Sequence, residues 1–306
     1  MPARLSLRPV RSSSILKENL VVGIGEALWD VFPDGKKLGG APANFAYHCS
    51  RFGIDSLAVS ALGDDPLGAE IASALREKVA INMPLVPYPT GTVQVSLDER
   101  GVPSYNITEG VAWDHIPLTE DLLETARHCQ AACFGTLAQR SPESRAAIQA
   151  FLDAMPSDSM KIFDINLRQH YYSKELVEQS LEKCNILKIN DEELEIVGRM
   201  FDISDLSPAE RCRRIRTYFG LGIVILTCGT SGSHVFADGV ESSLPTPEVA
   251  VVDTVGAGDS FTAAFCSSLL LGDSIPKAHE KAVALSAYVC TQSGAMPPIP
   301  SSLLSF

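Results

Sequence analysis

The chain has 306 residues, of which 45% are hydrophobic and 20% charged, so it can bury a large core in one sizeable α/β domain or in two smaller ones. A formal net charge of −12 and a pI of about 5.0 argue against nucleic acid or an anionic membrane as the main partner. No apolar run approaches the roughly 20 residues that a membrane helix needs.

The first 18 residues form a basic stretch with no acid before Glu18 and a run of serines in its middle. It contains no apolar segment of the kind that a secretory signal requires. We therefore expect a disordered N-terminal extension over residues 1–18 and a single folded domain from residue 19 to the end of the chain.

Eight cysteines are scattered along the chain without any Cys-x-x-Cys pair, which argues against a zinc ribbon or a redox motif. His128, Cys129 and Cys133 are conceivable metal ligands, but free cysteines are most often buried in the core. Reduced thiols are typical of a cytoplasmic protein, and we expect that location.

The folded part opens with a short buried strand over Leu20–Ile24. The run from Gly23 to Leu28 matches only half of a dinucleotide-binding fingerprint, because the third glycine is replaced by leucine and no helix follows. The segment from Trp29 to Lys37 instead predicts a β-hairpin that turns at its central Pro-Asp-Gly.

The run from Gly39 to Asn44 (GGAPAN) precedes a predicted helix that continues to about Cys49. Glycines such as Gly39 and Gly40 let the main chain pass close to a ligand, and the amide of Asn44 can both donate to and accept from hydroxyls. The alternative is an ordinary helix start with proline in its first turn.

The next predicted elements are a strand over Leu57–Leu62, a helix that ends near Val79, and a hairpin. This hairpin pairs an alternating, half-exposed strand over Thr92–Asp98 with a strand over Val102–Ile107. Gln94 and Tyr105, which lie on these two strands, are either ligand contacts or solvated strand residues.

From Thr119 helices and strands alternate regularly, as in a parallel α/β sheet. We predict helices from Thr119 to about Cys129 and over Pro142–Met155, with strands over Ala131–Phe134 and Lys161–Arg168. In the last strand Asp164, Asn166 and Arg168 alternate and should face one side, at the strand end where such folds bind ligands. An Asp164–Arg168 ion pair is the structural alternative.

Later elements include strands over Cys184–Ile189 and Ile223–Leu226 and a helix over Lys277–Cys290. The acidic run that begins at Asn190 is typical of a helix N-terminus. The arginines between Arg211 and Phe219 indicate a solvated helix face.

The stretch from Val249 to Phe265 carries the strongest signal. Val249–Val252 is an apolar β-branched run that predicts a buried strand, Gly256, Ala257 and Gly258 predict a tight turn, and a helix follows. The free amides at the helix start can bind a phosphate. Asp259 can take a proton from a nucleophile, although the helix dipole should lower its pKa; a plain helix cap is the alternative.

The run from Asp253 to Phe261 (DTVGAGDSF) closely resembles the C-terminal signature of ribokinase-like, phosphofructokinase-B type carbohydrate kinases. The GGAPAN run and the whole segment from Gly25 to His48 resemble bacterial fructokinases most. The resemblance covers residues 20 to about 300 and implies a three-layer α/β/α sandwich with a small β-sheet lid, formed by segments near 29–38 and 91–107.

The resemblance also implies a set of site residues. Asp259 would be the catalytic base, and Gly256, Ala257, Gly258 and Arg168 would stabilise the transferred phosphoryl group. The sugar would be bound by Asp30, Gly39, Gly40, Asn44, Gln94, Tyr105, Asp164 and Asn166. The nucleotide would contact Asn190, Thr227, Gly229, Gly232 and Gly258, and Glu193 would position the metal.

The implied reaction is transfer of a phosphoryl group from ATP, with Mg²⁺, to a hydroxyl of a small sugar, with D-fructose favoured. Ribose, 2-keto-3-deoxygluconate and nucleosides are alternative acceptors, and a non-catalytic sugar sensor is a further alternative. In relatives a monovalent cation such as K⁺ can bind near Asp253 and Gly294–Pro300, and the lid often pairs with a second subunit, which makes a homodimer a further expectation.

Overall fold

The computed structural model describes residues 20–33, 35–97 and 103–304, and the N-terminal extension lies outside them. Its largest element is a sheet with strand order β15-β14-β13-β12-β11-β10-β1-β4-β6. The strands are β1 (Leu20–Ile24), β4 (Asp55–Val59), β6 (Ala80–Asn82), β10 (Cys129–Phe134), β11 (Met160–Asp164), β12 (Ile186–Asn190), β13 (Ile223–Thr227), β14 (Ser233–Ala237) and β15 (Val240–Leu244). From β6 to β13 all neighbours are parallel, and β14 and β15 add antiparallel pairs at one edge.

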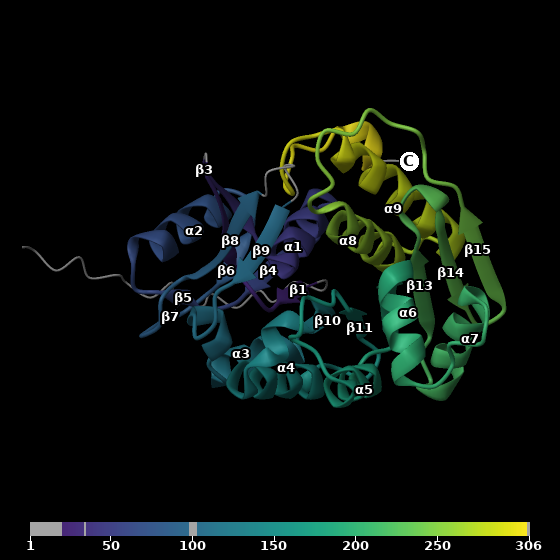
Figure 1. Ribbon diagram of the computed structural model, residues 1–306, viewed down its shortest axis with the longest axis horizontal. Helices are drawn as coiled ribbons and strands as arrows, with labels where there is room; N and C mark the ends of the chain where they lie inside the picture. Colours follow the sequence, from purple (N-terminus) through teal and green to yellow (C-terminus); the bar gives the residue numbers. More distant parts are fainter. Residues whose placement is uncertain (1–19, 34, 98–102, 305–306) are drawn as a thin grey trace, which may run out of the picture.

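Helices cover both faces of this sheet (Figure 1). One face carries α1 (Ala41–Arg51), α8 (Ala257–Leu270) and α9 (Ile275–Cys290), and the other carries α3 (Glu120–Arg127), α4 (Pro142–Ala154), α5 (Lys174–Lys183), α6 (Asp191–Met200) and α7 (Pro208–Tyr218). The central strands are apolar on both sides because both faces are buried. This arrangement confirms the expected three-layer α/β/α sandwich.

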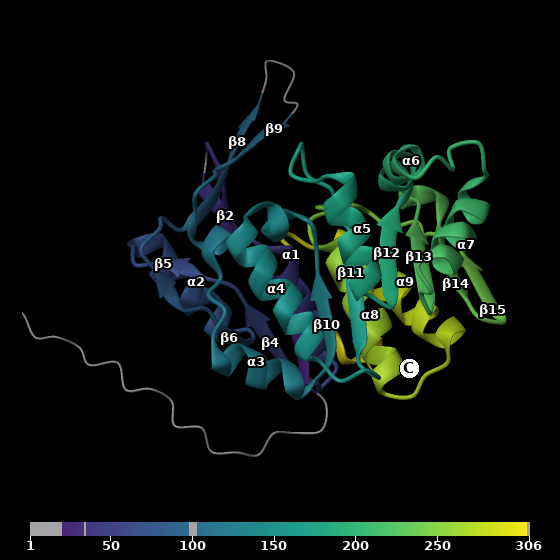
Figure 2. The same cartoon turned by 90° about the horizontal axis from the view of Figure 1, so that it is seen from below.

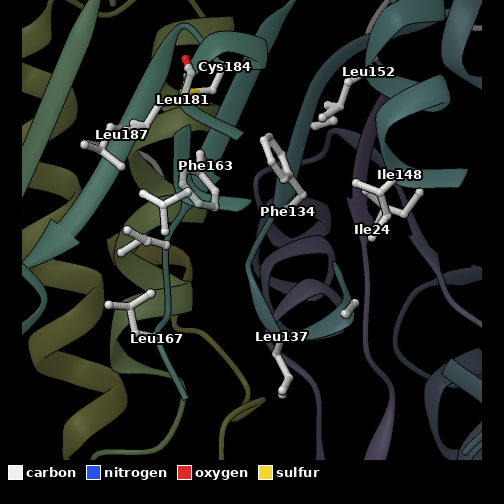
Figure 3. Packing of buried hydrophobic residues seen from close by; sticks show 14 of the residues in the cluster. Ile24, Phe134, Leu137, Ile148, Leu152, Phe163, Leu167, Leu181, Cys184 and Leu187 are labelled. Atoms are coloured by element: carbon white, nitrogen blue, oxygen red, sulfur yellow. Dashed lines mark hydrogen bonds between the residues drawn. The ribbon is translucent and has the colours of Figure 1, made fainter. Parts of the chain in front are cut away.

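Each helix layer encloses its own apolar cluster. In the layer of α4 and α5, the rings of Phe134 and Phe163 from neighbouring strands stack with their centroids 5.1 Å apart (Figure 3). Ile148 and Leu152 of α4 pack from the helix side of the same cluster. The opposite layer buries Phe265 of α8 against the other face of the sheet.

A second sheet of order β3-β2-β8-β9 stands at one end of the sandwich (Figure 2). Its strands are β2 (Leu28–Phe32), β3 (Gly35–Gly39), β8 (Gly91–Leu97) and β9 (Pro103–Ile107). β2 and β3 form the hairpin that the sequence predicts, and β8 and β9 form the second antiparallel pair. Nearby lie α2 (Pro66–Arg76) and the short parallel pair of β5 (Leu62–Gly63) and β7 (Leu85–Val86).

Three predictions about local structure are wrong. Val249–Val252 is an exposed loop rather than a buried strand, with Val251 62% and Val252 65% exposed. The strand expected over Lys161–Arg168 ends at Asp164, because Asn166 has a φ of 44° that no strand accommodates. Arg211 is buried and pairs with Glu195, so the arginines of α7 do not all lie on a solvated face.

Among the described residues, no helix combines the length and apolar character that crossing a membrane requires.

The first turn of α1 lies directly against the end of β1, because two glycines leave no side chain between them. A β-carbon on Gly23 would lie 1.9 Å from the carbonyl oxygen of Pro42, and one on Gly40 would lie 2.5 Å from the carbonyl oxygen of Glu26. The close approach fixes where α1 begins relative to the sheet.

We therefore expect Gly23→Ala to lower the free energy of unfolding by about 2 kcal/mol or more, since the added methyl group must push α1 away from β1. Gly222→Ala is the matched control, because its nearest neighbour would be the carbonyl oxygen of Asn185 at an ordinary 3.4 Å. Chemical denaturation of both variants checks this, and equal stability would contradict the account.

Candidate active site

The carboxyl ends of the parallel strands all point the same way and form the carboxyl edge of the large sheet. The first turns of α1 and α8 meet the ends of β10 and β11 there. A cavity lies there. It is lined by Glu26, Ala41, Pro42, Phe45, Cys133, Phe134, Gly135, Leu137, Asp164, Asn166 and Asp259. Segments that are far apart in the sequence thus supply four polar side chains to one apolar-walled space.

The turn before α8 has the geometry of an anion-binding helix start. Gly256 is the N-cap with a φ of 78°, and a β-carbon there would lie 2.7 Å from the Cβ atom of Ala295. The amide of Ala257 donates to the carbonyl of Thr254 at 3.2 Å, which removes it from the free donors. The amide of Gly258 lies in the first turn, where helix geometry offers no acceptor.

Asp259 follows in the same turn and is held by α1. Its Oδ2 atom accepts a hydrogen bond from Nδ2 of Asn44 at 2.7 Å. Burial raises the pKa of Asp259 to about 6, and the negative charge of Asp164 adds to the effect, while the Asn44 hydrogen bond and nearby positive charges oppose it. The expectation that the helix dipole would lower this pKa is therefore wrong, because desolvation outweighs it.

Asp164 does not pair with Arg168. Its Oδ1 atom lies 3.0 Å from Nζ of Lys188, and its Oδ2 atom accepts from the hydroxyl of Thr262 at 3.0 Å. Lys188 was not predicted from the sequence. It projects from the middle of β12 and lies beside the turn before α8, since a β-carbon on Gly258 would be 2.9 Å from Nζ of Lys188. A lone lysine within an apolar strand was the signal that could have revealed it.

Asn166 lines the cavity, whereas Arg168 is exposed and is not one of the lining residues. The left-handed conformation of Asn166 turns the chain away from the sheet after β11, so the two side chains do not continue the strand's alternation. The positive charge of Arg168 nevertheless opposes the rise in the pKa of both Asp30 and Asp259, so it lies within electrostatic reach of the cavity.

Asp30 lies on β2, in register with Lys37 of β3. A β-carbon on Gly39 would lie 2.7 Å from its Oδ2 atom, so the carboxylate rests against a glycine of the neighbouring strand. Burial raises the pKa of Asp30, and the charges of Arg168 and Lys37 oppose that shift.

The structure does not bring Gln94 to Asp30. In the parallel pairing of β2 with β8, Asp30 is in register with Val93 and Gln94 with Val31, so Asp30 and Gln94 lie on opposite faces of the small sheet. Gln94 is exposed. Tyr105 pairs with Val95 through its main chain, and its side chain lies outside the described part of the protein.

Asn190 and Glu193 form a capping box at the start of α6. The carboxylate of Glu193 accepts from the amide of Leu167 through Oε1 and from that of Asn190 through Oε2, both at 2.9 Å. Burial raises its pKa and Lys188 opposes that shift. Within the described residues no three His, Cys, Asp or Glu side chains gather as a metal site.

The turn between β13 and β14 is open to solvent on one side. Thr227 ends β13, Gly229 has a φ of 53° with open space where a side chain would stand, and Gly232 has a φ of 105° against the carbonyl oxygen of Leu244. The turn borders the same edge of the sheet as Asn190, in register with Thr227.

His128, Cys129 and Cys133 do not form a metal site in the described part of the chain. His128 pairs with Glu124 on α3, whereas Cys129 and Cys133 are buried free thiols. Burial raises the pKa of Cys129 to about 12, which keeps the thiol protonated and unreactive.

Comparison with known proteins agrees with this geometry. The model of the pfkB family carbohydrate kinases matches residues 25–302. The fructokinase of Klebsiella pneumoniae is 29% identical over 90% of this chain and 95% of its own length, and the probable fructokinase-2 of Arabidopsis thaliana is 27% identical over 95% of each.

Among solved structures, the fructokinase of Vibrio cholerae with bound fructose, ADP and calcium superposes with a TM-score of 0.80, at 25% identity over 94% of this chain and 99% of that one. The family match spans the anion-binding turn, the Asn44–Asp259 pair and the strand-end cavity together. This chain belongs to the pfkB family of carbohydrate kinases and is a sugar phosphotransferase.

Proposed function

We propose that this protein transfers the γ-phosphoryl group of Mg-ATP to a hydroxyl of D-fructose. The observation that carries the proposal is the carboxylate of Asp259, held by Asn44 inside the cavity and next to the free amides of α8. A pKa of about 6 leaves this carboxylate mostly ionised at neutral pH while making it a stronger base than an ordinary aspartate.

In the proposed step Asp259 orients the acceptor hydroxyl and takes its proton as the oxygen forms a bond to the γ-phosphorus. The bond from that phosphorus to the bridging oxygen breaks, and ADP leaves with the electron pair. The amide of Gly258, the ammonium of Lys188 and the guanidinium of Arg168 would stabilise the charge on the transferred group. The amide of Gly256 would assist, whereas that of Ala257 is already bonded.

On the acceptor side we assign Asp30, Asn44, Asp164 and Asn166 to the sugar hydroxyls. The Oδ1 atom of Asn44 supports this, because it is buried without a hydrogen-bond partner in the described part of the structure. Gly39 and Gly40 would leave room for the sugar. Contacts of Gln94 and Tyr105 with the sugar remain proposals, because they depend on how the small sheet closes over the cavity as a lid.

On the donor side we assign ATP to the open turn of Thr227, Gly229 and Gly232 and to Asn190. Bound Mg²⁺ would neutralise phosphate charge and orient the transferred group. Glu193 would act on it through water, since both of its oxygens already accept main-chain hydrogen bonds and Mg²⁺ keeps much of its water shell. A K⁺ requirement is tested by assays with and without potassium.

Fructose is favoured because the relatives and a similar solved structure are named fructokinases and because the segment from Gly25 to His48 resembles that group. Ribose, 2-keto-3-deoxygluconate and nucleosides are the competing acceptors.

A cytoplasmic location, where ATP is available, agrees with the eight free cysteines. A homodimer through the lid can be checked by light scattering.

Asp259→Asn should keep its affinity for ATP and lose at least ~100-fold in kcat, because the amide cannot accept the proton. Steady-state kinetics and nucleotide titration measure the two effects separately. Near-normal turnover in a folded Asp259→Asn enzyme would refute the assignment.

The pH dependence follows from the raised pKa. With Mg-ATP saturating, kcat/KM for the acceptor should decline about tenfold per pH unit below about 6, as Asp259 becomes protonated. In Asn44→Leu the decline should begin at higher pH, because the hydrogen bond that favours the ionised carboxylate is lost. An unshifted profile in that variant would contradict the pairing.

Coupled ADP-release assays with fructose, ribose, 2-keto-3-deoxygluconate and a nucleoside test which of them is the preferred acceptor. We expect kcat/KM for fructose to exceed that for each other acceptor by at least roughly tenfold, as sites built from hydrogen bonds discriminate strongly. Asp259→Asn, assayed in parallel, controls for contaminating kinases. A higher value for another acceptor would overturn the choice of fructose while leaving the kinase activity intact.

A further inference from the structure

Glu26 is a buried acid for which the proposed transfer step has no use. It lies two residues after the end of β1, is 5% exposed and lines the same cavity as Asp259. An acid buried there has to be compensated by hydrogen bonds or by neighbouring charge, because burying an unpaired carboxylate is costly.

The compensation comes from the start of α1. The N-cap of this helix is Gly40, which has no side chain to accept from the first free amides. Glu26 takes over that task from another segment: its Oε1 atom accepts from the amide of Ala41 at 3.3 Å. The two main chains also pass close to each other here, since a β-carbon on Gly40 would lie 2.5 Å from the carbonyl oxygen of Glu26.

The turn that Glu26 caps is the turn that carries Asn44. The amide of Asn44 donates to the carbonyl of Gly40 at 3.1 Å, and its side chain donates to Oδ2 of Asp259 at 2.7 Å. A chain of hydrogen bonds therefore runs from Glu26 through the first turn of α1 to the carboxylate of Asp259.

We propose that Glu26 is a positioning residue for phosphoryl transfer: its carboxylate fixes the first turn of α1 and thereby the amide of Asn44 that orients Asp259. This inference rests on the proposed role of Asp259 as the base. It adds that the geometry of the base depends on an acid from the loop between β1 and β2.

The pKa of Glu26 lies no lower than that of Asp259. Burial raises the pKa of Glu26 to about 7; hydrogen bonds from its own amide and that of Ala41 oppose the shift, the charge of Asp259 adds to it, and Arg168 opposes it. Asp164 and Lys188 also act on the pKa of Asp259, which is about 6. Glu26 is therefore largely protonated in the pH range where Asp259 titrates, and an amide in its place should leave the pKa of Asp259 nearly unchanged.

Two substitutions test this role. Glu26→Leu removes the acceptor, and we expect kcat to fall by about 10- to 100-fold, with KM for ATP within about twofold of the native value. The loosened amide of Asn44 should also move the acid limb of kcat/KM to higher pH. Glu26→Gln keeps an acceptor oxygen for the amide of Ala41, and we expect it to recover most of kcat with a nearly native acid limb.

Thr119→Ala is the matched control, because Thr119 caps α3, away from the cavity, through its hydroxyl and the amide of Leu122. It should lower the melting temperature without changing kcat. A folded Glu26→Leu enzyme that behaves like Thr119→Ala, or a Glu26→Gln enzyme that loses as much kcat as Glu26→Leu, would overturn the proposal.

The two assignments fail in different ways. If Asp259 is not the base, Asp259→Asn stays active whatever Glu26 does. If Glu26 has no positioning role, Asp259→Asn is inactive while Glu26→Leu turns over normally. Should Glu26→Leu not fold, Glu26→Asp decides the question, because its shorter side chain keeps the charge but draws the acceptor away from the amide of Ala41. Native kcat in that variant would overturn the proposal.

Discussion

The hydrogen bond between Asn44 and Asp259 joins the two helix starts on which the site depends. The residues are 215 positions apart in the sequence, yet α1 and α8 pack side by side on one face of the sheet. Because a helix moves as a rigid unit, seating α1 against β1 through Gly23 and Gly40 also sets the position of its Asn44 amide. The packing of one helix layer thus fixes the position of the Asp259 carboxylate.

The charges around the cavity explain how a protein with a negative net charge can bind a negatively charged substrate. Asp164, Asp259 and Glu26 would repel one another and any phosphate if they stood alone. Lys188 neutralises Asp164 from within the sheet, Arg168 adds positive charge at the rim, and the start of α8 supplies free amides. The positive potential is local, so a net charge of −12 is compatible with binding a nucleotide.

The small sheet is connected to this centre by a long-range contact. Lys37 of β3 lies in register with Asp30, and its Nζ atom contacts Oδ2 of Asp253 at 3.3 Å. Asp253 in turn accepts from the amides of Val255 and Gly294, just before the turn that begins α8. The small sheet is therefore joined to the segment before α8 by an ion pair whose lysine is 52% exposed, a kind of pair that contributes little to stability.

The sequence by itself determined the alternation of strands and helices, the hairpin of β2 and β3, and the glycine turn before Asp259, because these depend on local periodicity and on residues with special backbone preferences. The order of the layers was implied by the family resemblance. The family motifs also named most of the polar residues that the fold gathers at the strand ends.

Only the tertiary structure decided which segments join the sheet, which charged side chains pair and how burial changes the pKa of Asp259. Val249–Val252 reads locally as a strand, but it joins none of the sheets in the described residues, and the amide of Val252 instead donates to the carbonyl of Cys290 at the end of α9. The partner of Asp164 proved to be Lys188 rather than Arg168, and the pKa of Asp259 rises rather than falls. Pairing and desolvation depend on what surrounds a side chain in space, and neither is encoded in its immediate neighbours along the chain.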